Sequence, residues 1–354
     1  MVPTELSKTN TSRREFLRIA GLGLFAVAGG VTAGCATSRM TGDDTDVISQ
    51  DWESNPIIPL AEDGCYTGSD TEVSTVLSHR TYYVQRALHW WTIKSGKRPA
   101  IHCSGVGYYN AFNDHFPEED CRAALSNDVV PLVKHVIRYS SYKQIAHGNF
   151  DDILVKYARK MKNLNAPLFY VPFPEINCNK AWKSIEWGGQ SGRDAIKALR
   201  HMRHVYDSEG VDNAVWVIQY LTQKCPLWVY PGEFYPGDDI IDWIGFTVRS
   251  RQGEYIGPMR HIFDYSYRYS RSNHKNKPIM LVELGALTTS HRPKWITDAY
   301  FDIENRYPAV KAVLYSERPV VEIQENSTLG ELDKVALQKA LSSDYFIEGI
   351  PIKR

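Results

Sequence analysis

Two glutamates end apolar runs of the sequence, and their type and placement suit acid–base and nucleophilic chemistry. Glu175 follows the run at residues 168–174, and Glu283 follows the run at residues 279–282. Two carboxyl groups on one rim can cleave a glycoside, because one donates a proton to the leaving oxygen while the other attacks the anomeric carbon. A lone strand-end glutamate is more often a salt-bridged structural group, so the hypothesis depends on the pair.

The elements that would position this pair are short apolar runs that alternate with amphipathic, helix-length segments. Two of these segments predict helices, residues 151–163 with an Asn149 cap and residues 192–209 opened by Ser191 and Asp194 as a capping box. Eight runs are expected as strands: residues 64–68, 100–104, 135–140, 168–173, 214–221, 242–248, 279–283 and 310–316.

This alternation predicts an α/β fold, a single-domain (β/α)8 TIM barrel over residues 64–345 with a C-terminal tail at 346–354. Catalytic groups of such barrels lie at the carboxyl ends of the strands. Glu175 would end the fourth strand and Glu283 the seventh, so both are expected on one rim.

Composition narrows the class of protein. The chain of 354 residues is 43% hydrophobic and 23% charged, which excludes disordered and collagen-like classes. Lys+Arg and Asp+Glu both total 41, so no basic field favours nucleic acid as a partner. The 9 Trp, 21 Tyr and 12 Phe exceed what a core usually requires, and rings that line a sugar cleft would be one use.

The N-terminal segment has the pattern of an export signal. Residues 12–18 read SRREFLR, which resembles a twin-arginine signal, and an apolar stretch follows at 19–31. The sequence TAGC at 32–35 resembles a lipobox, so residues 1–34 are expected to be removed and Cys35 to carry lipid; simple cleavage near Ala33 is the alternative. Residues 35–63 would then tether an exported barrel that faces the periplasm or cell exterior, with membrane contact through the lipid only.

The other five cysteines have no C-x-x-C spacing, so a zinc or iron–sulfur site is not expected. An odd number leaves at least one thiol outside a disulfide, and no pairing is favoured.

Five motifs occur in order along the chain: GNFDD (148–152); EIN (175–177) with WGG (187–189); VDNAVWV (211–217); YPGDD (235–239) with DWIG (242–245); and KPIMLVELG (277–285). Together they resemble glycoside hydrolase family 26, the β-mannanase group of clan A barrels, from about residue 64 to residue 317. The resemblance implies a retaining, endo-acting hydrolase of a β-linked polysaccharide, with Glu175 as acid/base and Glu283 as nucleophile. It implies no metal and no other cofactor.

Several positions depart from the family pattern. Pro174 stands where the mannanases have a His, and Val171 stands where the family has an Arg that braces the nucleophile. After the sixth strand the family commonly reads Asp-Gly-Tyr, whereas this chain reads TVR and ends at Arg249. Arg249 either restores the lost charge and holds Glu283 ionised, or pairs with a carboxylate on the rim.

Further side chains are expected to bind substrate. Tyr315 stands nearest to the family's eighth-strand Trp and would keep a stacking ring. His102 is near the end of a predicted strand and would reach the cleft. The full set of expected substrate-binding residues is Trp182, Trp187, Asn177, Arg249, Tyr315 and His102.

Alternatives stay open at this point. Val171 and Pro174 would also suit a carbohydrate-binding barrel that has lost catalysis. The same carboxylates would serve an enzyme that trims or transglycosylates an exopolysaccharide. The sugar, its linkage, and internal versus terminal cleavage are not indicated by these residues.

Overall fold

Parallel strands form the centre of the structure, a computed structural model that describes residues 57–70, 80–106, 116–135, 141–178, 191–222, 229–250, 257–286, 290–316 and 328–352. Strands β1 to β8 follow one another around the sheet in chain order, pairing of β1 with β2 closes the sheet into a barrel, and the short β9 pairs with β1. The strands are β1 (Cys65–Ser69), β2 (Ile101–Val106), β3 (Val130–His135), β4 (Leu168–Pro172), β5 (Ala214–Leu221), β6 (Trp243–Ser250), β7 (Ile279–Ala286), β8 (Val310–Tyr315) and β9 (Phe346–Ile347).

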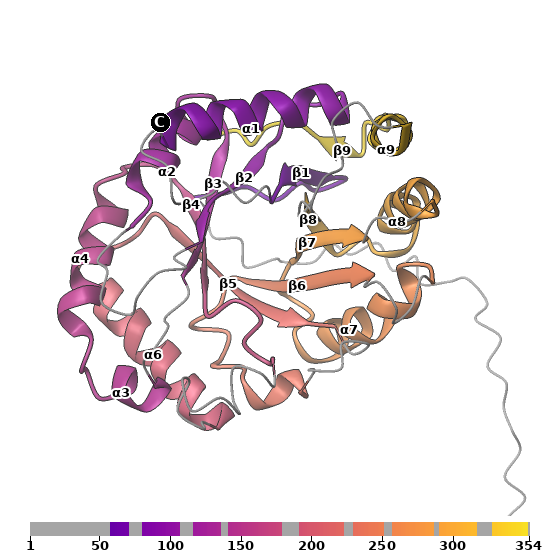
Figure 1. Cartoon of the computed structure of the whole chain (residues 1–354). Helices are drawn as coiled ribbons and strands as arrows, with labels where there is room; N and C mark the ends of the chain where they lie inside the picture. The colour runs from indigo at the N-terminus through magenta and orange to yellow at the C-terminus, as the bar shows by residue number, and fades with distance from the viewer. Residues whose placement is uncertain are drawn as a thin grey trace, which may run out of the picture. The chain divides into compact units, whose positions relative to one another are not determined.

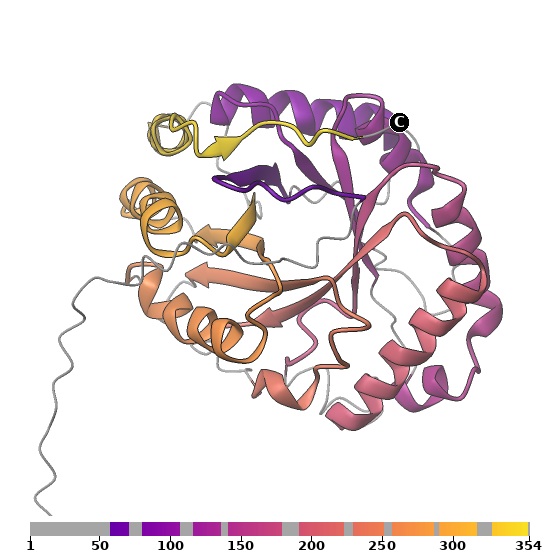
Figure 2. The same cartoon turned by 180° about the vertical axis from the view of Figure 1, so that it is seen from behind.

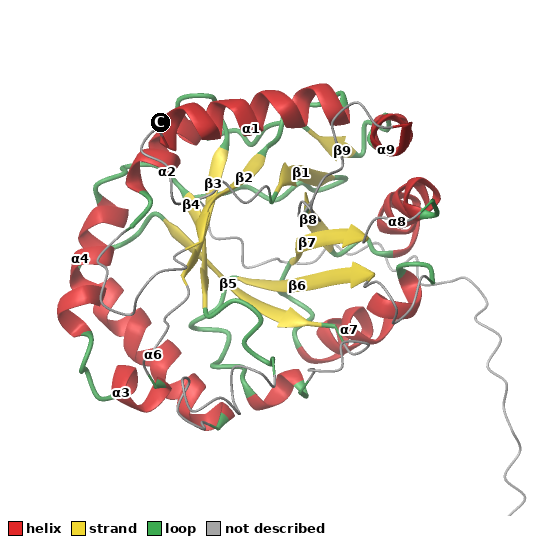
Figure 3. Ribbon diagram, in the orientation of Figure 1, coloured by secondary structure: helices red, strands yellow, loops and turns green. Residues whose placement is uncertain are grey.

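Helices surround the strands (Figure 1), and the colouring by secondary structure in Figure 3 separates the outer helices from the inner strands. They are α1 (Arg80–Ser95), α2 (Glu118–Leu125), α3 (Tyr142–Ala146), α4 (Asp151–Lys162), α6 (Gly192–Ser208), α7 (Arg260–Asn273), α8 (Arg292–Arg306) and α9 (Thr328–Ala340), with a short 3-10 helix η2 (Pro231–Glu233). The predicted (β/α)8 barrel is therefore confirmed.

Two local predictions are wrong. The third strand is Val130–His135 and so begins five residues before the predicted range 135–140, of which residues 136–140 lie outside the described residues. Pro131 argues against a central strand, because it has no N–H for the ladder, yet it pairs in register with His102 of β2. Helix α4 begins after Phe150, which makes no side-chain cap, rather than after an Asn149 cap. The capping box that opens α6 at Ser191 is confirmed.

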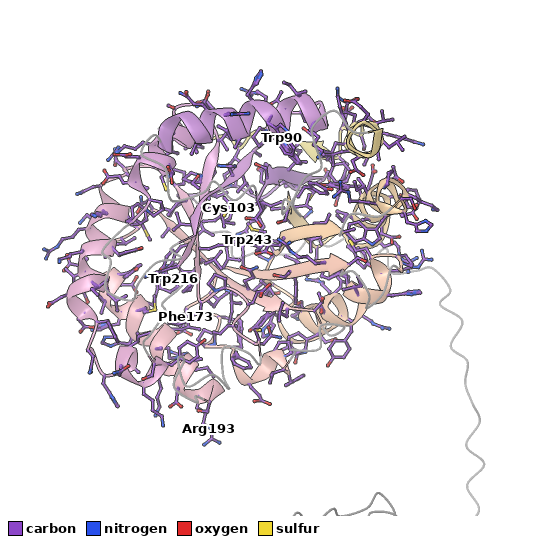
Figure 4. All side chains as sticks on the ribbon, viewed as in Figure 1. Trp90, Cys103, Phe173, Arg193, Trp216 and Trp243 are labelled. Carbon is purple, nitrogen blue, oxygen red and sulfur yellow. The ribbon has the colours of Figure 1, made fainter. Side chains whose placement is uncertain are left out.

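Side chains alternate along each strand and so form two apolar layers. One cluster fills the barrel interior and includes Val130, Val171 and Val282. The other lies between strands and helices and includes Tyr170 and Trp216. Figure 4 shows Trp243 and Cys103 near the middle of the ring of strands and Trp216 on the side of the helices.

Both chain segments that flank the strands contribute to the interior cluster. Ile58 and Ala61 belong to it from the N-terminal side, and Ile350 from the C-terminal side. Strand β9 pairs with β1, and Figure 2 shows the C-terminal segment beside β1. Parts of the segments expected as a tether and a tail therefore pack on the barrel.

Residues 1–56 lie outside the described residues, and so do Trp182 and Trp187. Export, lipidation of Cys35 and sugar contact by these two rings stay predictions. Within the part of the chain that the structure describes, no helix is long and apolar enough to span a bilayer.

Gly245 on β6 sits where the interior leaves no room for a methyl group. A Cβ there would lie 2.8 Å from Val282 Cγ2 and 2.9 Å from Val217 Cγ1. We expect Gly245→Ala to lower the free energy of unfolding by about 1–3 kcal/mol through overpacking. Urea unfolding measures this, with Val335→Ala on the exposed face of α9 as the control expected within about 0.5 kcal/mol of the parent. An unchanged Gly245→Ala midpoint would contradict the described packing.

Candidate active site

Polar side chains replace the apolar interior at the carboxyl ends of the strands. On β3, Val130 and Leu132 point into the barrel, and the next inward residue is Lys134. On β5, Val215 and Val217 point into the barrel, and the next inward residue is Gln219. The same alternation holds on the neighbouring strands. The inward polar residues at this end are Asp70, Lys134, Gln219, Thr247, Arg249 and Ser316.

A β-bulge turns Glu283 toward this group. Val282 belongs to the interior cluster, so simple alternation would point Glu283 toward the helices. The register between β6 and β7 shifts here, and Thr247 pairs with Glu283 directly after Phe246 pairs with Leu281. Such a bulge re-aims the side chain, which brings the Glu283 carboxylate into the barrel.

Two cations contact the Glu283 carboxylate, one on each oxygen. Lys134 Nζ donates to Oε1 at 2.7 Å, and Arg249 Nε donates to Oε2 at 2.9 Å. The amide nitrogen of Gln219 lies 3.5 Å from Oε1. Glu283 is buried, and carboxylates in such positions stay ionised when cations pair with them. Arg249 thus contacts Glu283, the first of its two expected partners, and its guanidinium also lies 3.8 Å from Asp70 Oδ2 on the rim.

Asp70 completes the ion pairs. It follows β1 directly, and its Oδ1 accepts from Lys134 Nζ at 2.9 Å while its Oδ2 accepts from Ser316 Oγ at 2.9 Å. Ser316 in turn accepts a hydrogen bond from Arg249. Lys134 and Arg249 thus lie among the carboxylates of Asp70 and Glu283 in a network drawn from β1, β3, β6, β7 and the end of β8.

Glu175 lies on the same rim in a strained turn. Phe173 and Glu175 have φ of 53° and 55°, a left-handed conformation that is costly for residues with a side chain. The Ile176 N–H donates to the Gln219 carbonyl at 3.0 Å, which anchors the turn on β5. Such strain is typical of positions that the surrounding structure holds for function.

Burial, together with the negative charge of Glu283, raises the pKa of Glu175. A hydrogen bond from Thr247 and the charges of Lys134 and Arg249 oppose this rise without cancelling it. Gln219 Nε2 donates to Thr247 Oγ1 at 2.8 Å, so the Thr247 hydroxyl has its own hydrogen available for Glu175. A protonated Glu175 beside an ionised Glu283 is the state that glycoside cleavage by a carboxyl pair requires.

Asn177 fastens the Glu175 turn to the chain beyond β5. Its Oδ1 accepts from the Leu221 N–H at 2.7 Å, and its Nδ2 donates to the carbonyls of Val229 at 2.8 Å and Leu221 at 3.3 Å. The side chain is fully buried, and both amide hydrogens are used. Asn177 was expected to contact sugar, but its side chain makes hydrogen bonds to the backbone of Leu221 and Val229 instead.

We expect Asn177→Ala to loosen the Glu175 turn. Because the backbone groups of Leu221 and Val229 lose their partner, the free energy of unfolding should fall by about 1–3 kcal/mol. The turn also loses its fixed position, so kcat should fall about 10-fold or more on any cleaved glycan. Calorimetry and steady-state kinetics measure the two effects, with Asn127→Ala at the end of α2 as control. Parent activity in a folded Asn177→Ala protein would contradict this role.

Tyr315 and His102 do not face the interior. Tyr315 belongs to the cluster between strands and helices, with its ring centroid 6.2 Å from that of Trp91. His102 stands between Ile101 and Cys103, which both face inward, and its Nδ1 lies 2.9 Å from Ser69 Oγ. Burial lowers the pKa of His102 to about 4, although Asp70 opposes this. Because side chains alternate along each strand, both residues point away from the barrel interior, which contradicts the sugar contacts expected for them.

Sequence reasoning missed Lys134 and Asp70. The signal for Asp70 was available, since it is an acidic residue two positions after the strand predicted at 64–68. Lys134 was missed because the third strand was predicted to begin at His135, whereas it begins at Val130. Within the described ranges, no group of three or more His, Cys, Asp or Glu side chains is arranged to hold a metal ion.

A closed parallel barrel with two carboxyl groups on its carboxyl rim is an arrangement that α/β-barrel glycosidases use. The sequence profile of glycosyl hydrolase family 26 matches residues 29–311, so the chain belongs to this family and is a glycosidase. The resemblance inferred from the five motifs is thereby confirmed.

Solved structures share the fold at low sequence identity. A β-mannanase from a symbiotic protist of the termite Reticulitermes speratus has a TM-score of 0.59 and 17% identity, covering 84% of this chain and 98% of that one. The catalytic domain of the endo-β-1,4-mannanase of Bacillus sp. JAMB-750 has a TM-score of 0.61 and 13% identity, covering 80% and 87%. The Bacillus subtilis mannanase BCman has a TM-score of 0.54 and 17% identity, covering 81% and 87%. No curated protein matches the chain significantly.

Proposed function

We propose that the protein is a retaining glycoside hydrolase that cleaves a β-linked polysaccharide of the mannan kind, with Glu175 as acid/base and Glu283 as nucleophile. The observation that carries the proposal is the contrast between the two carboxyl groups. Glu283 has a cation on each oxygen, whereas burial and the charge of Glu283 raise the pKa of Glu175.

The reaction would proceed in two displacements. A Glu283 oxygen attacks the anomeric carbon, the bond from that carbon to the leaving oxygen breaks, and Glu175 gives its proton to the leaving oxygen. A water molecule then attacks the same carbon, Glu175 takes a proton from the water, and Glu283 departs as a carboxylate. Thr247 can donate to Glu175 while Glu175 is ionised between the two steps.

The comparisons support mannan as the first substrate to test, because the three solved structures named above are mannanases. Val171 and Pro174 replace residues of the family pattern, so other β-linked glycans belong in the same test. Export by the twin-arginine pathway and a lipid anchor at Cys35 complete the proposal and would place the activity at the cell envelope.

Hydrolysis of a polysaccharide panel tests the proposal. The purified protein is assayed on β-1,4-mannan, mixed-linkage β-glucan, β-xylan and an envelope exopolysaccharide, beside Glu175→Gln and Glu283→Gln. We expect cleavage of at least one polymer and its loss in both variants. Binding of a glycan without cleavage, or cleavage that persists in either variant, would contradict the proposal.

A further inference from the structure

We propose that Lys134 and Asp70 act as a positioning pair that sets the charge and orientation of Glu283; the inference rests on the proposed role of Glu283 as nucleophile. The pair spans the barrel from β3 to the end of β1. Neither residue belongs to the five family motifs.

The geometry leaves the Lys134 ammonium little freedom. Its Nζ donates to Asp70 Oδ1 at 2.9 Å and to Glu283 Oε1 at 2.7 Å, and the side chains of Lys134 and Asp70 are only 4% and 2% exposed. Asp70 is itself held by Ser316 Oγ and by its own N–H, which donates to the Tyr315 carbonyl at 2.9 Å. A buried ammonium held by two carboxylates fixes the position of each.

Burial alone would lower the pKa of Lys134, but the charges of Asp70 and Glu283 outweigh it and leave this pKa well above its ordinary value. Lys134 therefore keeps its charge in a site that water scarcely reaches. An ion pair in such a site is screened much less than one on the surface.

The position of Lys134 explains how the barrel carries this charge. Lys134 is the register partner of Val171, so the two inward side chains lie side by side on β3 and β4. An apolar residue on β4 leaves room for an ammonium that enters from β3. The lysine cation beside Glu283 thus comes from β3, the neighbour of β4, where Val171 stands in place of the family's arginine.

The other groups that face Glu283 have different roles. Arg249 of β6 contacts Oε2, Gln219 of β5 lies near Oε1, and Glu175 faces the carboxylate from the end of β4. Asp70 shares the charge of Lys134 and lies 3.8 Å from the Arg249 guanidinium. The Lys134 cation therefore stabilises the negative charge of Glu283, while Asp70 competes for the same cation.

Opposite shifts of the pH profile test this pair. In Lys134→Met, the acidic limb of kcat/KM should move up by about 1–3 pH units, because an adjacent cation is lost. In Asp70→Asn, the limb should move down, because Lys134 then serves Glu283 alone. We expect kcat of Lys134→Met to fall about 10²-fold, with KM changed much less. Lys311→Met is the matched control, since Lys311 is a buried lysine that donates to the Glu62 carbonyl and makes no contact with Glu283.

Carbon-13 NMR of protein labelled at the glutamate δ-carboxyl separates this inference from the proposed function. The Glu283 signal is assigned by its absence in Glu283→Gln, and its titration should shift in the same opposite directions even if no glycan is cleaved. If Lys134→Met does not fold, the charge-balanced variant Lys134→Met/Asp70→Asn takes its place and should raise the pKa of Glu283. Unchanged titration, or shifts of equal sign in the folded variants, would overturn the inference.

Discussion

Glu283→Ala is expected to lower kcat/KM on the cleaved glycan by about 10⁴-fold or more, the scale of losing a nucleophile. The carboxylate is replaced by a methyl group, so Lys134 and Arg249 each lose one acceptor and keep Asp70 and Ser316, respectively, as partners. The space left beside these cations suits a small anion. Steady-state kinetics on the substrate found in the panel measure the loss.

Azide tests whether the loss is chemical. We expect sodium azide to restore turnover of an activated aryl glycoside by Glu283→Ala, because azide enters the space of the carboxylate. The product should be the α-glycosyl azide, since attack comes from the face that Glu283 occupied. Glu283→Gln serves as the control, because its amide fills the same space and should prevent rescue. A β-glycosyl azide, or loss of folded protein in place of loss of activity, would contradict the role of Glu283.

Glu175→Gln should produce a loss that depends on the leaving group. Removal of a general acid costs about 10²–10⁴-fold when the leaving oxygen needs a proton. A polysaccharide needs that proton, whereas a dinitrophenyl glycoside departs without it. We therefore expect a large loss of kcat/KM on the polymer and a small one on the aryl substrate.

The same variant should change the alkaline side of the pH profile. Since burial and the charge of Glu283 raise the pKa of Glu175, the protonated form is favoured and activity is lost as pH rises through that pKa. In Glu175→Gln this alkaline fall should disappear on the aryl glycoside. Equal losses on both substrates, or an alkaline limb that stays in place, would count against Glu175 as the acid.

The catalytic pair could be found from the sequence because strand ends mark the active rim of a barrel. The runs before Glu175 and Glu283 are apolar and bounded by Pro or Gly, which made both strands easy to recognise. The inward direction of Glu283 could not be read in the same way. It depends on a bulge between β6 and β7, and the register of two strands is not visible in either strand alone.

The alternation of side chains along each strand explains the wrong predictions for residues around the catalytic pair. Placing the third strand at residues 135–140 removed Lys134 from consideration, although Lys134 is the inward residue near the end of β3. Tyr315 was expected in the cleft, but Ser316 is the inward residue and Tyr315 packs under the helices. A shift of one residue moves a side chain to the opposite face, so strand boundaries limit what sequence alone can assign.

The site of the covalent intermediate is the decisive measurement for Glu283 as nucleophile. The protein is incubated with a 2-deoxy-2-fluoro manno-oligosaccharide bearing an activated leaving group, digested, and examined by mass spectrometry. We expect one fluoro-oligosaccharyl group on the peptide that contains Glu283, and none in Glu283→Gln. A label on another residue, or first-formed product of inverted anomeric configuration without any label, would contradict it.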